Sequence, residues 1–228
     1  MLTFVKLRGL LRVVSTSLVT PKLLAGLLAA GACVAQQPYE IGGGIGYGSY
    51  HNGSVISSGG TAAAGIRNRF AATAVIGEDH FEHFSGEIRY LYHDGDTFLS
   101  SGSIKGNVQA QSHALHYDVL FHFKPRRERI RPFVAGGVGA KYYETTGPVP
   151  NPQPLPKIAG LTNQSQWKPL FTVGAGVKVR LGDHVIVRGD FRDYITVFPD
   201  RLFAPVEGAT SRGIFHQFTP LFGLSYGF

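Results

Sequence analysis

Two features of ordinary proteins are scarce in this 228-residue sequence: it has a single cysteine, Cys33, and it lacks long apolar runs. A membrane-spanning helix needs about 20 consecutive apolar residues, and no segment after residue 35 approaches that length. Cys33 lies in an expected leader peptide, so the rest of the chain has neither disulfides nor thiolate metal ligands. These absences exclude a helical membrane protein and a disulfide-stabilised domain.

An excess of positive charge is also nearly absent once the first 35 residues are set aside. The chain has 22 basic and 15 acidic side chains, and four of the basic ones lie in residues 1–35 with no acid. The remainder therefore carries 18 − 15 = +3. Its one basic cluster, residues 124–131, lies between two strand patterns and is interpreted as a solvated turn. We predict no nucleic-acid partner.

The amino-terminal segment predicts export. Residues 1–22 are basic, and residues 23–35 form a 13-residue apolar and small run that is too short to span a bilayer. We predict a signal peptide over 1–35 that is removed after Ala35 following Sec export, and a single mature domain over 36–228. Residues 30–33 loosely resemble a lipobox, but the usual Leu three residues before Cys33 is missing, which favours cleavage over lipidation.

What the sequence does contain is a period-2 pattern rich in glycine and aromatic residues. It has 30 Gly, 16 Phe and 10 Tyr, yet its mean hydropathy is close to zero. Eight segments show the pattern: 39–50, 68–77, 84–94, 108–123, 131–143, 168–181, 184–197 and 213–228. Four long connections (51–67, 95–107, 144–167 and 198–212) alternate with three short ones (78–83, 124–130 and 182–183). This alternation predicts an all-β, eight-stranded antiparallel up-and-down transmembrane β-barrel, with the long loops outside and the short turns in the periplasm.

The two faces of the strands show that this barrel lies in a membrane. Val185, Val187 and Phe191 share one face of segment 184–197, and charged side chains share the other. In water, a barrel with its charged face inward would expose its apolar face to solvent, which is unfavourable. In a membrane, the apolar face contacts lipid and the charged face lines the lumen, so both faces are in a favourable environment. Aromatic residues near the strand ends are predicted to form interfacial girdles: Tyr47, Tyr90, Tyr92, Tyr142, Tyr143 and Trp167. His216 interrupts the apolar face of the last strand and is expected to reach headgroups at the outer rim.

The inward faces predict a network of charges. An eight-stranded barrel is just wide enough for side chains to fill, and buried charges must pair because an unpaired ion costs several kcal/mol. The predicted network has four acids and five bases: Glu40, Glu87, Asp118, Asp190, Arg89, Lys178, Arg180, Arg188 and Arg192. We interpret it as a structural plug; the alternative is a gated ion path through the same residues. Glycine-rich stretches 42–46 and 136–139 are expected to make room for such side chains, and neither has the Gly-Lys-Ser/Thr ending of a phosphate loop.

The last strand runs to the end of the sequence with apolar residues at every second position: Phe222, Leu224, Tyr226 and Phe228. This pattern resembles the terminal strand of bacterial outer-membrane β-barrels, where a final aromatic residue serves as an assembly signal. Residues 85–92 (SGEIRYLY) and 188–194 (RGDFRDY) likewise resemble strands of the small outer-membrane β-barrel family, such as the OmpA transmembrane domain and OmpX-like proteins. The resemblance implies a Gram-negative outer membrane, with membrane lipid, lipopolysaccharide and the barrel assembly machinery as partners.

That family includes lipid A-modifying enzymes, which imply a His, a Ser and an acid near the outer rim. His83, Ser85 and Glu87 have the right residue types but lie by a short turn on the predicted periplasmic side. We therefore predict a non-enzymatic barrel without cofactor, metal or catalytic residues, which maintains the envelope or makes surface contacts. The alternatives are a lipid A-modifying enzyme and a narrow ion channel. A surface ligand is expected at the proline-rich loop 144–167, stiffened by polyproline-like segments, and at loop 198–212.

Overall fold

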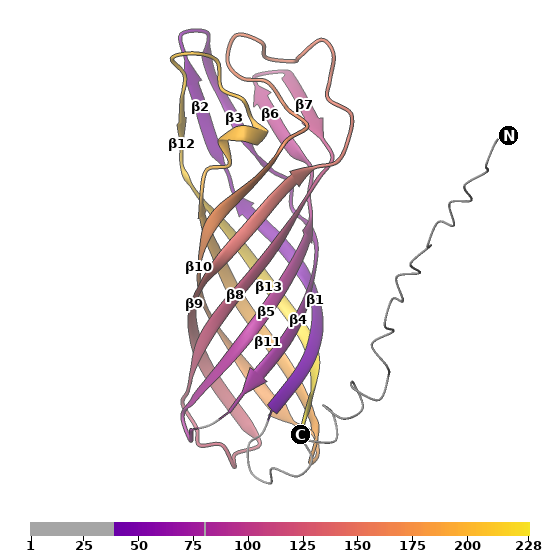
Figure 1. Ribbon diagram of the computed structural model, residues 1–228, viewed down its shortest axis with the longest axis vertical. Helices are drawn as coiled ribbons and strands as arrows, with labels where there is room; N and C mark the ends of the chain where they lie inside the picture. The colour runs from indigo at the N-terminus through magenta and orange to yellow at the C-terminus, as the bar shows by residue number, and fades with distance from the viewer. Residues whose placement is uncertain (1–38, 80) are drawn as a thin grey trace, which may run out of the picture. The chain divides into compact units, whose positions relative to one another are not determined.

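The computed structural model describes residues 39–79 and 81–228, so the predicted signal peptide and its cleavage site lie outside the described residues. Eight long strands close into an antiparallel barrel in the order β1-β13-β11-β10-β9-β8-β5-β4 (Figure 1). They are β1 (Tyr39–His51), β4 (Arg69–Glu78), β5 (Phe84–Asp94), β8 (Ala110–His122), β9 (Ile130–Thr145), β10 (Ser165–Arg180), β11 (Val185–Val197) and β13 (Ile214–Gly227). The predicted eight-stranded barrel is confirmed, with every strand boundary within three residues. Within the described ranges no helix is long and apolar enough to cross a membrane.

The first and last strands close the barrel. In the antiparallel register Ile45 of β1 lies opposite Phe222 of β13 on one side and opposite Ala72 of β4 on the other. The backbone amide of Tyr39 donates to the carbonyl of Phe228 at 2.8 Å, and the amide of Phe228 donates back to Tyr39 at 2.9 Å. No strand edge of the barrel is left open, as a membrane-spanning sheet requires.

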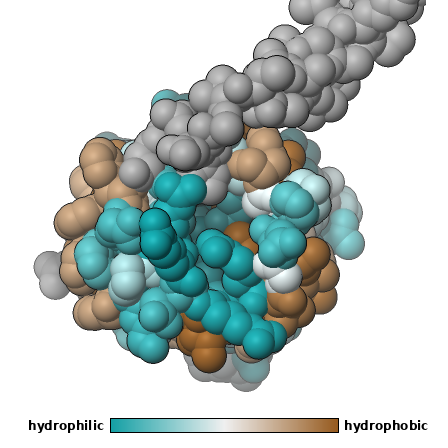
Figure 2. Space-filling model, turned by 90° about the horizontal axis from the view of Figure 1, so that it is seen from below, coloured by the Kyte–Doolittle hydropathy of each residue, from teal (hydrophilic) through white to brown (hydrophobic). Residues whose placement is uncertain are grey.

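The outward face of the wall is apolar and the inward face is polar. Outward side chains such as Ile45 and Phe222 are 61% and 72% exposed, while polar residues on the same strands, such as Glu40 and Gln217, are buried inside. Seen along the barrel, apolar side chains surround a hydrophilic centre (Figure 2). The short connections and Tyr39 and Phe228 lie at one end of the barrel, here called the turn end, and the long connections lie at the loop end (Figure 1).

The long connections are structured, which the sequence analysis did not predict. They form a second sheet beyond the loop end, in the order β12-β2-β3-β6-β7 (Figure 1). Its members are β2 (Gly53–Ser57), β3 (Gly60–Ile66), β6 (Thr97–Ser101), β7 (Ile104–Val108) and β12 (Thr210–Arg212), accompanied by the 3-10 helix η2 (Asp200–Leu202). Gly60 and Gly102, at the two tight turns of this sheet, have φ values of 124° and 58°, a region that favours glycine. We call this sheet and the segments packed on it the cap.

An apolar core joins the cap to the barrel. Barrel strands contribute Tyr50, Tyr143 and Phe215, and these pack with buried residues from all four long connections. Those residues are Val55, Ala62, Ala64, Ile66, Leu99, Val108, Leu155, Ile158, Ala159, Leu161, Phe198, Leu202 and Phe203. The proline-rich segment is therefore packed into the cap rather than forming a separate polyproline-like rod.

Candidate functional site

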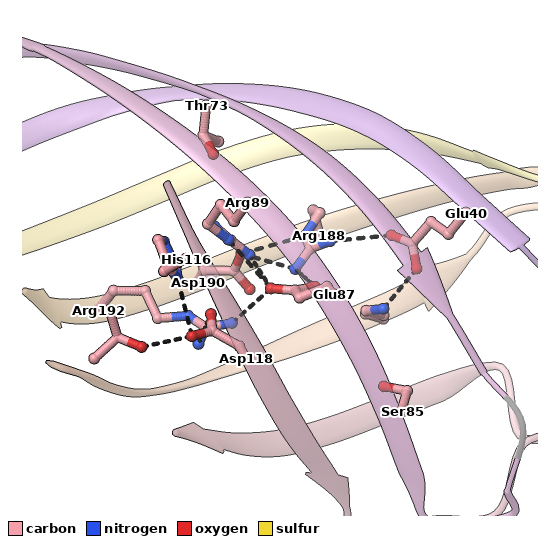
Figure 3. A network of polar contacts seen from close by, with 12 residues as sticks. Glu40, Thr73, Ser85, Glu87, Arg89, His116, Asp118, Arg188, Asp190 and Arg192 are labelled. Atoms are coloured by element: carbon pink, nitrogen blue, oxygen red, sulfur yellow. Dashed lines mark hydrogen bonds and ion pairs between the residues drawn. The ribbon is translucent and has the colours of Figure 1, made fainter. Parts of the chain in front are cut away.

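The inward faces of five strands bring charged side chains together in the half of the lumen nearer the turn end. Alternate residues of a strand point the same way, so Glu87 and Arg89 of β5 face the lumen with Arg188, Asp190 and Arg192 of β11 (Figure 3). Strands β1, β8 and β10 add one charged residue each: Glu40, Asp118 and Lys178. We call these eight residues the lumen network.

Glu87 is the centre of the lumen network, because three arginines contact its carboxylate (Figure 3). Its Oε1 accepts hydrogen bonds from Arg89 Nη2 at 2.6 Å and from Arg192 Nη2 at 2.9 Å. Its Oε2 accepts one from Arg188 Nη2 at 2.9 Å. Charge-assisted bonds of this kind are roughly twice as strong as neutral ones.

Two arms extend from this centre. Toward the turn end, Glu40 accepts hydrogen bonds from Lys178 Nζ at 2.5 Å and from Arg188 Nη1 at 3.1 Å. On the other side, Asp118 accepts one from Arg192 Nη1 at 2.8 Å and lies 2.9 Å from His116 Nδ1. A further contact crosses the lumen, because Arg89 of β5 donates to Asp190 of β11 at 2.6 Å and these strands are not paired.

The lumen network is balanced in charge and closed to solvent. Its four acids face four bases, and all eight residues are 0–7% exposed. Small residues on neighbouring strands make this density possible: a Cβ on Gly137 would lie 2.0 Å from Asp118 Oδ1, and one on Gly174 would lie 2.4 Å from Arg192 Cδ. For stretch 136–139, this confirms that glycines make room for bulky lumen side chains.

Arg180, which the sequence analysis included in the network, does not join it. It is the last residue of β10, at the turn end, and its Nη2 donates to the backbone carbonyl of Arg126 at 3.4 Å. No carboxylate of a described residue lies within ion-pair distance. At the mouth of the barrel, partial exposure to water can replace an acidic partner.

Arg131, in contrast, was predicted to lie outside the lumen but lies inside it. It was assigned to a solvated turn, but it is 4% exposed on the inward face of β9 and pairs with Asp79. The signal was available in the sequence, because Arg131 has the same strand parity as the inward-facing Phe133 and Ala135. Only the remainder of the basic cluster lies in the turn.

An apolar layer separates the lumen network from the loop end. Along β5 the inward face runs from Arg89 through Leu91 to His93, and along β11 Tyr194 follows Arg192. Leu91 and Tyr194 pack with four other buried side chains: Ala71, Ala114, Leu170 and Leu221. Charged groups of the lumen are therefore divided into two levels.

The second level is built around Lys141, which the sequence analysis missed. Its Nζ donates to Tyr50 Oη at 3.0 Å and to Gln217 Oε1, and it lies 4.9 Å from the ring centres of both Tyr50 and Tyr143. No acidic side chain among the described residues forms an ion pair with it, although it is fully buried. The ammonium of Lys141 is thus stabilised by contacts with hydroxyl, amide and aromatic groups instead of a carboxylate.

We expect Lys141→Met to change the free energy of unfolding by less than about 1 kcal/mol. Removing a buried cation relieves its desolvation, and methionine retains the packing, which offsets the two lost hydrogen bonds. Urea unfolding of the folded chain in detergent measures this. A loss above about 3 kcal/mol would show that the ammonium itself holds the loop end together.

The candidate catalytic residues do not form an accessible site. Ser85 Oγ lies 2.8 Å from His122 Nε2, and His83 Nδ1 lies 2.8 Å from the carbonyl of His122, so Ser85 and His83 are not paired with each other. Ser85 and His122 are buried in the lumen, away from the lipid-facing wall. In the described ranges no three His, Cys, Asp or Glu side chains gather closely enough to hold a metal ion.

The outward face carries an aromatic cluster toward the loop end. His113 Nδ1 and Tyr90 Oη are hydrogen-bonded at 2.7 Å. The His113 ring also contacts the rings of Tyr92 and Tyr142, and Tyr142 in turn contacts Trp167. Tyr47 is also exposed on the wall. Five of the six predicted girdle residues therefore face outward. The assignment of Tyr143 was wrong, because its neighbour Tyr142 takes the outward position and turns Tyr143 into the cap core.

His216 also faces outward, and it has a protein partner. Its Nδ1 lies 2.7 Å from Asp193 Oδ2 on the adjacent β11, and its ring stacks on Phe218. The contact explains how an acid and a histidine are accommodated on an otherwise apolar wall.

The predicted assembly-signal residues also share the outward face, each at least half exposed: Phe222, Leu224, Tyr226 and Phe228. Their exposure places them where a second protein can contact the strand. Their role in assembly stays a prediction.

Comparison with known proteins agrees with this architecture. A family model described as the outer membrane protein beta-barrel domain matches residues 22–228. Among solved structures, the outer membrane protein OprG from Pseudomonas aeruginosa is 12% identical, with 84% of this chain and 95% of that chain covered and a TM-score of 0.54. Neisserial surface protein A (NspA) is 10% identical, with 85% and 99% covered and a TM-score of 0.49. The N-terminal β-barrel domain of Pseudomonas aeruginosa OprF is 14% identical, with 85% and 100% covered and a TM-score of 0.45. No curated protein matches the chain.

Proposed function

The chain belongs to the outer membrane protein β-barrel domain family, and from this premise we propose that it is a closed, non-enzymatic barrel that presents its cap to the cell exterior. Membership confirms the predicted location in the bacterial outer membrane and the resemblance to small outer-membrane barrels. The wall is therefore surrounded by membrane lipid. The role that we propose is to support the envelope or to make surface contacts through the cap.

One observation carries this proposal: all eight residues of the lumen network are 0–7% exposed, which supports a lumen that is closed to water at this point. In a channel that conducts ions, pore-lining charges contact solvent. Here the charges contact one another, the apolar layer around Leu91 and Tyr194 lies above them, and the cap core covers the loop end. The lumen network, the apolar layer and the cap core would each oppose the passage of ions.

The rigid cap supports a role in surface contact. Segments 144–167 and 198–212 are held to each other by backbone hydrogen bonds, including Gly160 N to Ala204 O at 3.1 Å and Thr162 N to Leu202 O at 3.2 Å. Lys168 of β10 donates to Asp200 Oδ1 at 2.7 Å, and this hydrogen bond lowers the pKa of the Asp200 carboxyl. An ordered surface loses little conformational entropy when a partner binds.

Conductance in planar bilayers tests the closed lumen. We expect the purified mature chain to give no channel steps above the bilayer baseline, because three buried levels obstruct the lumen. Regular steps that depend on protein would favour the ion-channel alternative.

Incubation with lipopolysaccharide, followed by mass spectrometry of lipid A, is expected to leave the acyl chains unchanged. Loss or gain of an acyl chain would favour the enzyme alternative.

A further inference from the structure

The outer surface of the cap has a small cavity on the β6–β7 hairpin. It measures about 210 Å³ and is lined by Arg67, Phe98, Leu99, Ser100, Lys105 and Gly106. Such a volume lies below the roughly 300–1,000 Å³ of typical drug-sized pockets and suits a group the size of one sugar. We call it the cap cavity.

Strand register explains why these residues meet. Ser100 of β6 lies opposite Lys105 of β7, and directly opposed residues of an antiparallel pair point to the same face. Phe98 shares this face because it lies two residues before Ser100. Leu99 points the other way, into the cap core, which fixes the outward direction of its neighbours. Arg67 enters from the end of β3, anchored by its backbone amide to the carbonyl of Asp96 at 2.8 Å.

In the part of the chain that the structure describes, two cations at the cap cavity have no acidic partner. Neither Arg67 nor Lys105 forms an ion pair with any described residue. The acids nearest along the chain to the β6–β7 hairpin, Asp94 and Asp96, both form ion pairs with Arg69, at 3.3 and 2.8 Å. The cavity thus combines two positive charges, neither paired with a described acid, with an aromatic ring and a hydroxyl group.

We propose that the cap cavity binds a phosphate monoester carried on a sugar. The fork of Arg67 and the ammonium of Lys105 suit the oxygens of a phosphate, which carries nearly two negative charges at neutral pH. Ser100 supplies a further hydrogen-bond donor, and the ring of Phe98 offers an apolar surface to the carbon face of the sugar. The proposal rests on the cap facing the exterior but not on the lumen being closed.

The test is a titration of the folded mature chain in detergent micelles, followed by two-dimensional NMR of backbone amides. With glucose 6-phosphate we expect saturable shifts at Ser100 and Gly106, and with glucose we expect none. The double variant R67Q/K105Q should bind at least about tenfold more weakly, because it loses both charge-assisted contacts. The matched double variant K157Q/R201Q removes two cap charges outside the cavity and should bind within twofold of the unaltered chain.

Two further experiments test the contribution of the Phe98 ring and the molecule that carries the phosphate. Phe98→Ala should weaken glucose 6-phosphate but leave inorganic phosphate unchanged, since only the sugar contacts the ring. If lipid A causes shifts and glucose 6-phosphate does not, the cavity binds phosphate as proposed, and its ligand is a lipid headgroup. Equal binding by R67Q/K105Q and the unaltered chain, or no saturable shift with any phosphate, would overturn the proposal. The planar-bilayer result would stand in either case.

Discussion

Glu87→Gln is expected to lower the free energy of unfolding by about 3–5 kcal/mol, the range found when one partner of a buried ion pair is removed. The isosteric amide keeps the volume but leaves Arg89, Arg188 and Arg192 with a neutral group in place of the charge that they share. Because the site is almost closed to solvent, water cannot take over this role. The lumen network would then carry an excess positive charge.

Urea unfolding in detergent, followed by the fluorescence of the only tryptophan, Trp167, measures the effect. Trp167 lies on the outward wall at 64% exposure, so its emission reports whether the wall remains in an apolar environment. Glu207→Gln, which removes an exposed acid from the cap, serves as the control and should shift the midpoint negligibly. A loss below about 0.5 kcal/mol for Glu87→Gln would contradict the interpretation of the lumen as a charge-paired plug.

The double variant Glu87→Gln, Arg188→Met tests charge balance directly. It removes one acid and one base from the same contact, so the four-to-four balance becomes three-to-three. We expect it to be less destabilised than the sum of the two single changes by about 1–3 kcal/mol, the coupling typical of neighbouring charged residues. Additive losses would indicate that packing, rather than charge pairing, determines the stability of the lumen.

The period-2 pattern was sufficient to predict the barrel and most of its charged lumen residues, because parity alone decides which face a side chain takes. It could not predict which charges meet. The contact between Arg89 and Asp190 joins strands that are not neighbours, and it depends on the stagger of the closed barrel. Lys141 was not among the predicted lumen residues, although it has the same parity on β9 as Arg131.

The cap escaped prediction for a different reason. Its strands have only three to seven residues and use small side chains such as Ala62 and Ala64, so their alternation is weak. Its core also draws on four connections far apart in the sequence, and none has enough apolar residues to indicate a folded unit alone. The positions of the long connections were predicted correctly, but the packing between them depends on the barrel that brings their ends together.

Phe203→Ala is expected to open the cap while leaving the barrel closed. Phe203 is fully buried, and its ring lies 5.2 Å from that of Phe198 in the core shared by cap and barrel. Removing a buried phenylalanine ring costs about 3–5 kcal/mol, and this loss falls on the cap, which has no surrounding lipid to support it. Limited digestion of the folded protein with trypsin should then cut at Lys157 and Arg201 at least about tenfold faster, since local opening controls cleavage.

Ile104→Ala, which truncates an exposed cap residue, is the matched control and should digest at the rate of the unaltered chain. Because closed barrels resist SDS until they are heated, we expect both variants to change their mobility on SDS gels when boiled. Unchanged protease resistance of Phe203→Ala would mean that the barrel strands, and not the cap core, hold the long connections in place.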